Sequence, residues 1–368
     1  MNHRKKRSSG FRWVIFSLYT SVLLFAAGCS SSTAPPPTPP LEKWQVFQKA
    51  TGKLINSHIN SIFFDNSRRI WLATNDGASY FSGGTWASIR DSLYTPDGRG
   101  GPPSYRVNCI AQAKDRSMWF GLAGGGVERY NPISSIAVWT RYTSESTLYG
   151  LISNTILSMT ADLSNQSAYG EVWFTSAIGI SRFIGAVNET GIWRFYTHDN
   201  TDQIPSNQVP ASITKLDDNT IWFGTQTGGG VSAEYGLAGL NWTRYPLPVD
   251  SKINSVAFDL HNSVWFGTLQ GAWSFNLQTS RWTQYDSTGP GAPLGSVNAV
   301  VTNHQNIRWF GTYAGVARFN DTTWTRFTTA NSPLPSDTIN ALAYDFNQNI
   351  WIGTSNGVAV YNESGVSF

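Results

Sequence analysis

The stretch Ile339–Tyr361, INALAYDFNQNIWIGTSNGVAVY, contains the pattern that decides the fold. It opens with the alternating run Ile339-Asn340-Ala341-Leu342-Ala343 and continues after a polar turn with Ile350-Trp351-Ile352-Gly353-Thr354. A second turn leads into the run Gly357-Val358-Ala359-Val360-Tyr361. Three short runs of β-forming residues, separated by Asp, Asn and Gly, predict three consecutive antiparallel strands.

The same unit recurs along the chain. A Trp followed by small residues stands at Trp71, Trp119, Trp173, Trp222, Trp265, Trp309 and Trp351, with spacings of 48, 54, 49, 43, 44 and 42 residues. A second Trp, in the pattern Trp-x-x-aromatic, stands at Trp44, Trp139, Trp193, Trp242, Trp282 and Trp324, with Trp86 as a looser copy. Four strands per repeat form one antiparallel sheet, so the sequence predicts an all-β, seven-bladed β-propeller of four-stranded blades.

The phase of the repeats predicts how the ring closes. The first repeat begins with the outer-strand motif Trp44 to Phe47, and the last one ends after its third strand at Tyr361. We therefore expect the N-terminal strand to complete the seventh blade, because an open stack would leave an unpaired edge. A fourth strand from the tail that ends at Phe368 is the alternative.

Composition excludes several other classes. Apolar residues make up 40% of the chain and charged residues only 13%, which excludes a disordered protein and disfavours a helical bundle. The 2 cysteines cannot build a disulfide scaffold or a four-thiolate metal site. Cys109 lies in an apolar run and is expected to be a buried, inert thiol.

The N-terminus predicts export and anchoring. Residues 1–28 combine a basic stretch with an apolar run from Trp13 to Ala27, which is typical of a signal peptide; a short uncleaved membrane anchor is the alternative. Ala26-Ala27-Gly28-Cys29 resembles the lipobox of bacterial lipoproteins, in which the cysteine is lipidated. Residues 29–43 form a Ser/Pro-rich tether, 44–361 the propeller and 362–368 a C-terminal tail. We expect a lipid-anchored protein of the bacterial cell envelope, on the periplasmic side of the outer membrane or at the cell surface.

Charge then argues against a nucleic-acid partner. The predicted signal peptide contains five of the 26 basic residues (Arg4, Lys5, Lys6, Arg7 and Arg12) and none of the 23 acidic ones. The mature chain would have 21 basic and 23 acidic residues, so the positive charge of the whole chain belongs to the leader.

The repeats resemble those of the two-component regulator propeller family, whose pattern runs N-x-I-x-S-I, D-x-x-G-x-I-W-x-G-T, G-L-x-x-Y and W-x-x-Y. Asp345, Ile350–Thr354, Gly357 and Tyr361 follow it closely, and Asn331–Ser336 matches the usual loop between blades. The resemblance implies a periplasmic sensor region that recognises carbohydrates or other external signals. No kinase follows Tyr361 in this sequence, so signalling would require a separate protein partner.

Binding residues are best sought where the repeats differ. Residues at one register in every blade, the tryptophans above all, are expected to build the inter-blade core. Asparagines recurring in the inner strands (Asn60, Asn108, Asn254, Asn298 and Asn340) are expected to satisfy backbone groups, with Leu157 and Pro210 replacing them in two blades. Long inter-blade loops on one face supply the candidate contacts Tyr94, Asp97, Arg99, Tyr105, Arg106, Tyr149, His198 and Asp199. Trp273, outside both series, is a candidate exposed aromatic platform.

No motif indicates catalysis. The sequence lacks HExxH, CxxC and G-x-S-x-G, and we expect no metal or other cofactor, although a dependence on calcium stays open. The main hypothesis is an envelope propeller that binds a glycan or a protein partner, with a sensory or accessory role. A polysaccharide lyase or glycoside hydrolase on the same scaffold, and a structural assembly protein, are the alternatives. Streptogramin lyases share the seven-bladed fold and Trp-Phe-Thr motifs such as Trp173-Phe174-Thr175, but fold alone does not assign a function.

Overall fold

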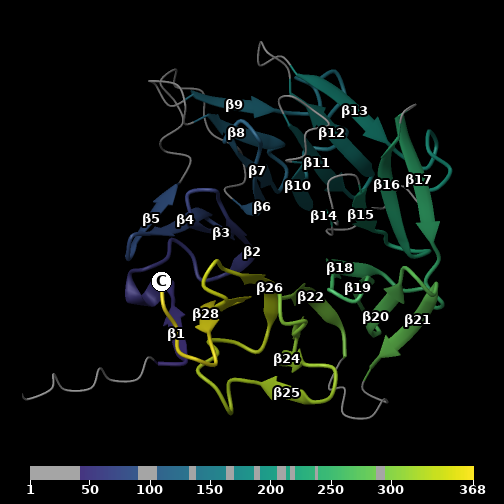
Figure 1. Cartoon of the computed structure of the whole chain (residues 1–368). Helices are drawn as coiled ribbons and strands as arrows, with labels where there is room; N and C mark the ends of the chain where they lie inside the picture. The colour runs from purple at the N-terminus through teal and green to yellow at the C-terminus, as the bar shows by residue number, and fades with distance from the viewer. Residues whose placement is uncertain are drawn as a thin grey trace, which may run out of the picture. The chain divides into compact units, whose positions relative to one another are not determined.

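The computed structural model describes residues 42–89, 106–131, 138–162, 170–185, 191–204, 213–215, 220–236, 239–286 and 295–368. Within these ranges the chain forms seven four-stranded antiparallel sheets and one short 3₁₀-helix, η1 (Lys49–Thr51). Figure 1 shows the sheets following one another around a ring. The all-β, seven-bladed prediction is confirmed.

Six blades take their four strands consecutively from the chain. Blades 1 and 2 contain β2 (Ile59–Phe64), β3 (Ile70–Thr74), β4 (Gly77–Ser82) and β5 (Thr85–Ile89), then β6 (Val107–Gln112), β7 (Met118–Leu122), β8 (Val127–Asn131) and β9 (Val138–Tyr142). Blades 3 and 4 contain β10 (Ser158–Asp162), β11 (Glu171–Ser176), β12 (Gly179–Ile184) and β13 (Ile192–Tyr196), then β14 (Ile213–Lys215), β15 (Thr220–Gly224), β16 (Gly230–Gly236) and β17 (Gly239–Tyr245). Blades 5 and 6 contain β18 (Ile253–Phe258), β19 (Ser263–Thr268), β20 (Gly271–Asn276) and β21 (Arg281–Tyr285), then β22 (Val297–Thr302), β23 (Arg308–Thr312), β24 (Gly315–Phe319) and β25 (Trp324–Phe327).

The seventh blade joins the two ends of the propeller. It consists of β26 (Ile339–Tyr344), β27 (Ile350–Thr354), β28 (Gly357–Tyr361) and, as its outer strand, β1 (Trp44–Phe47). β1 pairs antiparallel with β28, with Trp44 opposite Tyr361 and Phe47 opposite Val358. The inner strands contact their neighbours around the ring, and β26 contacts β2. The N-terminal strand therefore closes the ring, as the phase of the repeats predicts.

The apolar core lies between neighbouring blades. The seven tryptophans of the first series are all almost fully buried. Trp71 illustrates their role, because it packs from blade 1 against Val107, Ile110 and Phe120 of blade 2. Since each sheet presents apolar residues to the next, the tryptophans are structural, as expected from their repetition.

Trp273 belongs to the same core, so the prediction of an exposed aromatic platform is wrong. Its side chain is only 6% exposed and packs in one cluster with Trp222, Phe266 and Phe275. Strand alternation explains this position, because Trp273 and Phe275 point to the same face of β20. Cys109 is likewise buried and unpaired, and burial raises the pKa of its thiol, which fits an inert role.

Aspartates in the turns between first and second strands bind the buried indoles. The carboxylates of Asp65, Asp259 and Asp345 accept hydrogen bonds from the Nε1 atoms of Trp71, Trp265 and Trp351 at 2.8, 2.7 and 2.9 Å. In each turn the other carboxylate oxygen accepts backbone N–H groups. The Asp of the repeat pattern thus satisfies a buried donor and closes a turn, which are structural tasks.

Residues 1–41, with Cys29 and most of the predicted tether, lie outside the described part of the chain. Among the described residues, no helix has both the length and the apolar character needed to span a bilayer.

Candidate functional site

A β-bulge in the inner strand marks the centre of five blades. The register between first and second strands shifts at this point in blades 1, 2, 5, 6 and 7, and the residue skipped by the pairing is Asn60, Asn108, Asn254, Asn298 or Asn340. A bulged residue leaves the regular ladder and its side chain is re-aimed. The repeated asparagines are therefore directed toward the central channel by the backbone itself.

Each of these amides connects its blade to the next one. The Nδ2 atoms of Asn60, Asn108, Asn254, Asn298 and Asn340 donate to the backbone oxygens of Val107, Ile156, Val297, Ile339 and Ile59, at 2.8, 2.6, 3.1, 3.1 and 3.0 Å. This confirms that the asparagines satisfy backbone groups around the channel. Leu157 holds the equivalent place in blade 3, whereas Pro210 lies outside the described residues.

The amides leave a polar cavity at the channel mouth. It has a volume of about 390 Å³, and its lining includes the five asparagines together with Lys252 and Tyr313. Because a backbone oxygen can only accept, Nδ2 must face the neighbouring blade and Oδ1 is left for the cavity. In the described part of the chain no hydrogen bond reaches the Oδ1 atoms of Asn254, Asn298 and Asn340, so the mouth offers free acceptors.

Basic residues stand immediately before the inner strands. The Arg106 Nε atom donates to Asn108 Oδ1 at 2.9 Å, and the Lys252 ammonium group makes no hydrogen bond or ion pair with any described residue. Burial and, second, the nearby Arg106 charge lower the pKa of His58, which favours a neutral imidazole near pH 7. Its Nε2 atom lies 3.4 Å from Asn340 Nδ2 and can act as the acceptor.

Exposed apolar side chains lie on the face that carries this mouth. Leu269 and Tyr313 occupy equivalent turns between second and third strands, with 53% and 63% of their surface exposed. The backbone N–H of Leu269 donates to the Lys252 oxygen at 3.4 Å, which sets this turn beside the mouth. Ile178, in the corresponding turn of blade 3, is 51% exposed. We refer to His58, Arg106, Lys252, Leu269, Tyr313 and the five asparagines as the channel-mouth site.

The predicted contact residues fall into three groups. Arg106 belongs to the channel-mouth site, whereas Tyr94, Asp97, Arg99 and Tyr105 lie outside the described residues. Tyr149 is 66% exposed on the loop between β9 and β10, where both Leu148 and Tyr149 have a positive φ. His198 and Asp199 are exposed on the next inter-blade loop, and the His198 Nδ1 atom lies 2.7 Å from the Ile204 oxygen.

Sequence reasoning missed Lys252, Leu269 and Tyr313. A signal was present, because the residue after each Trp-x-Gly-Thr motif varies: it is Leu269 in blade 5, Tyr313 in blade 6 and Ser355 in blade 7. Among the described residues, no three His, Cys, Asp or Glu side chains are grouped so that they could hold a metal ion.

Comparisons with known proteins agree with this architecture. The model of the two component regulator propeller family matches residues 53–76 and 333–356. The extracellular domain of a protein described as a hybrid two component system from B. thetaiotaomicron is 19% identical, with a TM-score of 0.69, over 89% of this chain and 44% of that chain. The type-IX secretion component PorZ of Porphyromonas gingivalis is 17% identical, with a TM-score of 0.67, over 85% of this chain and 48% of that chain.

A shorter protein matches over nearly its whole length. Virginiamycin B lyase from Staphylococcus aureus is 14% identical, with a TM-score of 0.61, over 86% of this chain and 98% of that chain. No curated protein sequence matches the chain. At these identities the structural matches show the fold alone, and the chain spans less than half of the two envelope proteins. The family model falls on the inner two strands of blades 1 and 7 and the loops before them, so the chain is a seven-bladed β-propeller in which two blades match the two component regulator propeller model.

Proposed function

We propose that the channel-mouth site binds a hydroxyl-rich ligand, most simply a glycan, presented from outside the cell. The observation that carries this proposal is the set of amide oxygens left without donors by the inter-blade hydrogen bonds. Sugar hydroxyls supply such donors, the Tyr313 ring offers an exposed surface for a sugar face, and Lys252 supplies a donor for a ring or hydroxyl oxygen.

The location forms part of the same proposal. Residues 1–28 would direct export, Cys29 would be lipidated, and the tether would hold the propeller away from the membrane. Similar propellers occur in the extracellular domain of a two-component system and in a bacterial surface component, which supports a role outside the cytoplasm. Binding would then be relayed through an envelope or signalling protein partner.

A protein ligand is the second candidate. Leu148, Ile178 and Leu269 expose 88%, 51% and 53% of their surfaces in loops and turns on the same face as the mouth. Exposed apolar groups at the rim of a polar site are typical of protein interfaces. A partner that inserts a polar loop into the channel while covering these side chains would use both features.

Two substitutions test the glycan proposal. We expect Tyr313→Ala and Asn298→Leu each to weaken glycan binding by about tenfold, since each removes a contact worth about 1–2 kcal/mol. Asn298→Leu reproduces what blade 3 already has at Leu157, so we expect it to cost only about 1 kcal/mol of stability. Leu260→Ala, which removes a 62% exposed side chain from a turn on the opposite face, is the matched control.

The measurement is the rise in melting temperature with neutral and acidic oligosaccharides, followed by calorimetric titration, with the sugars assayed for cleavage. A saturable shift that both mouth variants reduce and Leu260→Ala retains would support the proposal. Cleavage of the sugar would replace binding by catalysis. No shift with any sugar would reject the glycan and leave the protein partner.

A further inference from the structure

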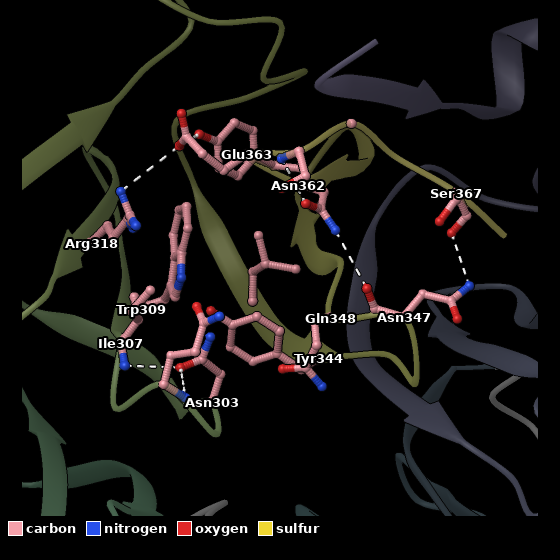
Figure 2. A pocket seen from close by; sticks show the side chains of 15 residues that line it. Asn303, Ile307, Trp309, Arg318, Tyr344, Asn347, Gln348, Asn362, Glu363 and Ser367 are labelled. Carbon is pink, nitrogen blue, oxygen red and sulfur yellow. Dashed lines mark hydrogen bonds and ion pairs between the residues drawn. The ribbon is translucent and has the colours of Figure 1, made fainter. Parts of the chain in front are cut away.

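A second polar cavity lies between blades 6 and 7, on the opposite face of the propeller from the channel-mouth site. Its volume is about 450 Å³. Figure 2 shows Trp309, Arg318, Tyr344 and Glu363 around it, together with amides of the turns and the C-terminal segment. All of its lining residues belong to the described part of the chain.

Blade 6 departs from the repeat pattern at this cavity. Asn303 stands where blades 1, 5 and 7 have the aspartate that binds the buried indole. Its Oδ1 atom accepts the backbone N–H groups of Gln305 and Ile307, both at 2.9 Å. These two bonds fix the orientation of the amide. The remaining terminal atom is therefore Nδ2, a donor, at the place where Asp345 of blade 7 has a second carboxylate oxygen.

The indole of blade 6 consequently lacks the carboxylate acceptor that the indoles of blades 1, 5 and 7 have. Trp309 is 2% exposed, and its buried Nε1 atom has the Tyr344 phenol beside it instead of a carboxylate. Burial raises the pKa of the adjacent Tyr344, an effect that the Trp309 indole and the Arg318 charge oppose in part, so this phenol stays neutral. Ile307 stands where blade 7 has Asn349, so it adds no polar group.

Among the described residues, Arg318 also has no carboxylate within hydrogen-bonding distance. It lies opposite Trp309 on the third strand, as Arg129 and Arg182 lie opposite their own tryptophans in blades 2 and 3. Those two guanidinium groups bind carboxylates at 2.5 Å. Arg318 Nη1 is 3.9 Å from the nearest carboxylate, that of Glu363, which is 59% exposed and already holds Lys43 at 2.9 Å.

We propose that the cavity between blades 6 and 7 binds a small organic carboxylate. The Arg318 guanidinium and Asn303 Nδ2 are two donors in a place where sister blades provide a carboxylate of their own. A ligand carboxylate would supply the missing oxygens to both, since bonds from a guanidinium to a carboxylate are short and strong. The aromatic walls and the Asn347 side chain favour a hydroxylated carbon skeleton.

The test is calorimetric titration of the full chain with glucuronate, glucose, acetate and inorganic phosphate. We expect glucuronate to bind more tightly than acetate and glucose not to bind at this cavity. Arg318→Gln should weaken glucuronate binding by about tenfold or more. Glu363→Gln should leave binding equal or tighter, because it removes the only competing carboxylate near Arg318 among the described residues.

Asn303→Asp is the sharpest variant. It restores the repeat pattern and supplies an internal acceptor to Trp309, so we expect a higher melting temperature together with loss of glucuronate binding. A variant that gains stability cannot lose binding through misfolding. Tyr313→Ala, at the channel-mouth site, should leave glucuronate binding unchanged, which separates this site from the one proposed above.

Any one of the following outcomes would overturn the proposal. They are equal binding of glucose and glucuronate by the Tyr313→Ala variant, tighter binding of phosphate than of glucuronate, and glucuronate binding that survives both Arg318→Gln and Asn303→Asp. Absence of binding by every carboxylate would do the same.

Discussion

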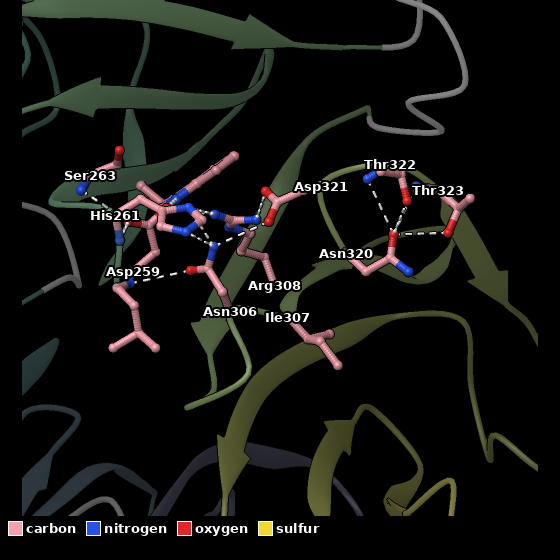
Figure 3. A network of polar contacts seen from close by, with 12 residues as sticks. Asp259, His261, Ser263, Asn306, Ile307, Arg308, Asn320, Asp321, Thr322 and Thr323 are labelled. Atoms are coloured by element: carbon pink, nitrogen blue, oxygen red, sulfur yellow. Dashed lines mark hydrogen bonds and ion pairs between the residues drawn. The ribbon is translucent and has the colours of Figure 1, made fainter.

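Replacing Arg308 by methionine is expected to lower the free energy of unfolding by about 3–5 kcal/mol, the cost of leaving one charge of a buried pair without its partner. Arg308 and Asp259 are 2% and 1% exposed, and the guanidinium lies 2.8 Å from the carboxylate across the interface of blades 5 and 6. It also pairs with Asp321 and stands 5.1 Å from the centre of the Trp265 ring. Figure 3 shows Arg308, Asp259 and Asp321 converging with His261 and Asn306.

Two controls separate burial from charge. Lys43→Met breaks an ion pair of similar length, 2.9 Å, whose partners are 56% and 59% exposed, and we expect it to cost less than about 1 kcal/mol. Combining Arg308→Met with Asp259→Leu removes both buried charges and should recover part of the loss. Chemical denaturation of the four proteins checks this ordering, and an Arg308→Met variant as stable as Lys43→Met would contradict it.

The lowered pKa of Asp259 predicts how the stability of the protein depends on pH. Burial raises the pKa of Asp259, but hydrogen bonds from the Trp265 indole and from Arg308 outweigh it, so the pKa lies below its ordinary value. A carboxyl group whose pKa is lower in the folded state stabilises the protein above the unfolded pKa of about 3.9. This stabilisation disappears as the pH falls through the folded pKa. Denaturation curves should therefore show wild type and Asp259→Asn converging below about pH 4.

Period and phase made the fold predictable. The tryptophan series repeats because every blade must bury one indole against the next, and the position of Trp44 and Tyr361 fixes which strand closes the ring. The inner-strand asparagines were predictable for the same reason, since each satisfies a backbone oxygen of its neighbour. Features shared by all blades can be predicted from one sequence because the same residues recur in several repeats.

The sites were harder to predict, because much of each depends on residues that depart from the repeat. Trp273 does depart from it, but strand alternation turns its side chain into the core, which its isolation in the sequence does not reveal. Asn303 is a one-atom change from the repeated aspartate, and its effect depends on Trp309 and Arg318 meeting it across two other strands. Tyr313 and Lys252 come together only because the turns of different blades converge on one channel.

Removing residues 1–47 is expected to lower the free energy of unfolding by more than about 5 kcal/mol and to make the protein associate. β1 places Trp44 against Tyr361 and Phe327, with ring centroids 4.6 and 5.4 Å apart. Phe47 packs at the other end against Trp86 and Trp351, at 5.2 and 6.1 Å. Truncating one fully buried aromatic costs about 3–5 kcal/mol, and the deletion removes two partly buried ones together with a row of strand hydrogen bonds.

The deletion also exposes the edge of β28, and an unpaired strand edge can form hydrogen bonds with a strand of another chain. The matched control begins at Glu42 and keeps β1, so it should melt like the longer chain and stay monomeric. Restoring the backbone of β1 with alanine at positions 44 and 47 should give an intermediate stability but prevent association, because pairing is kept and packing is lost. Melting curves and light scattering distinguish these cases. If the protein without β1 had the same melting temperature as the control, the tail of residues 362–368 rather than the N-terminal strand would hold the seventh blade closed.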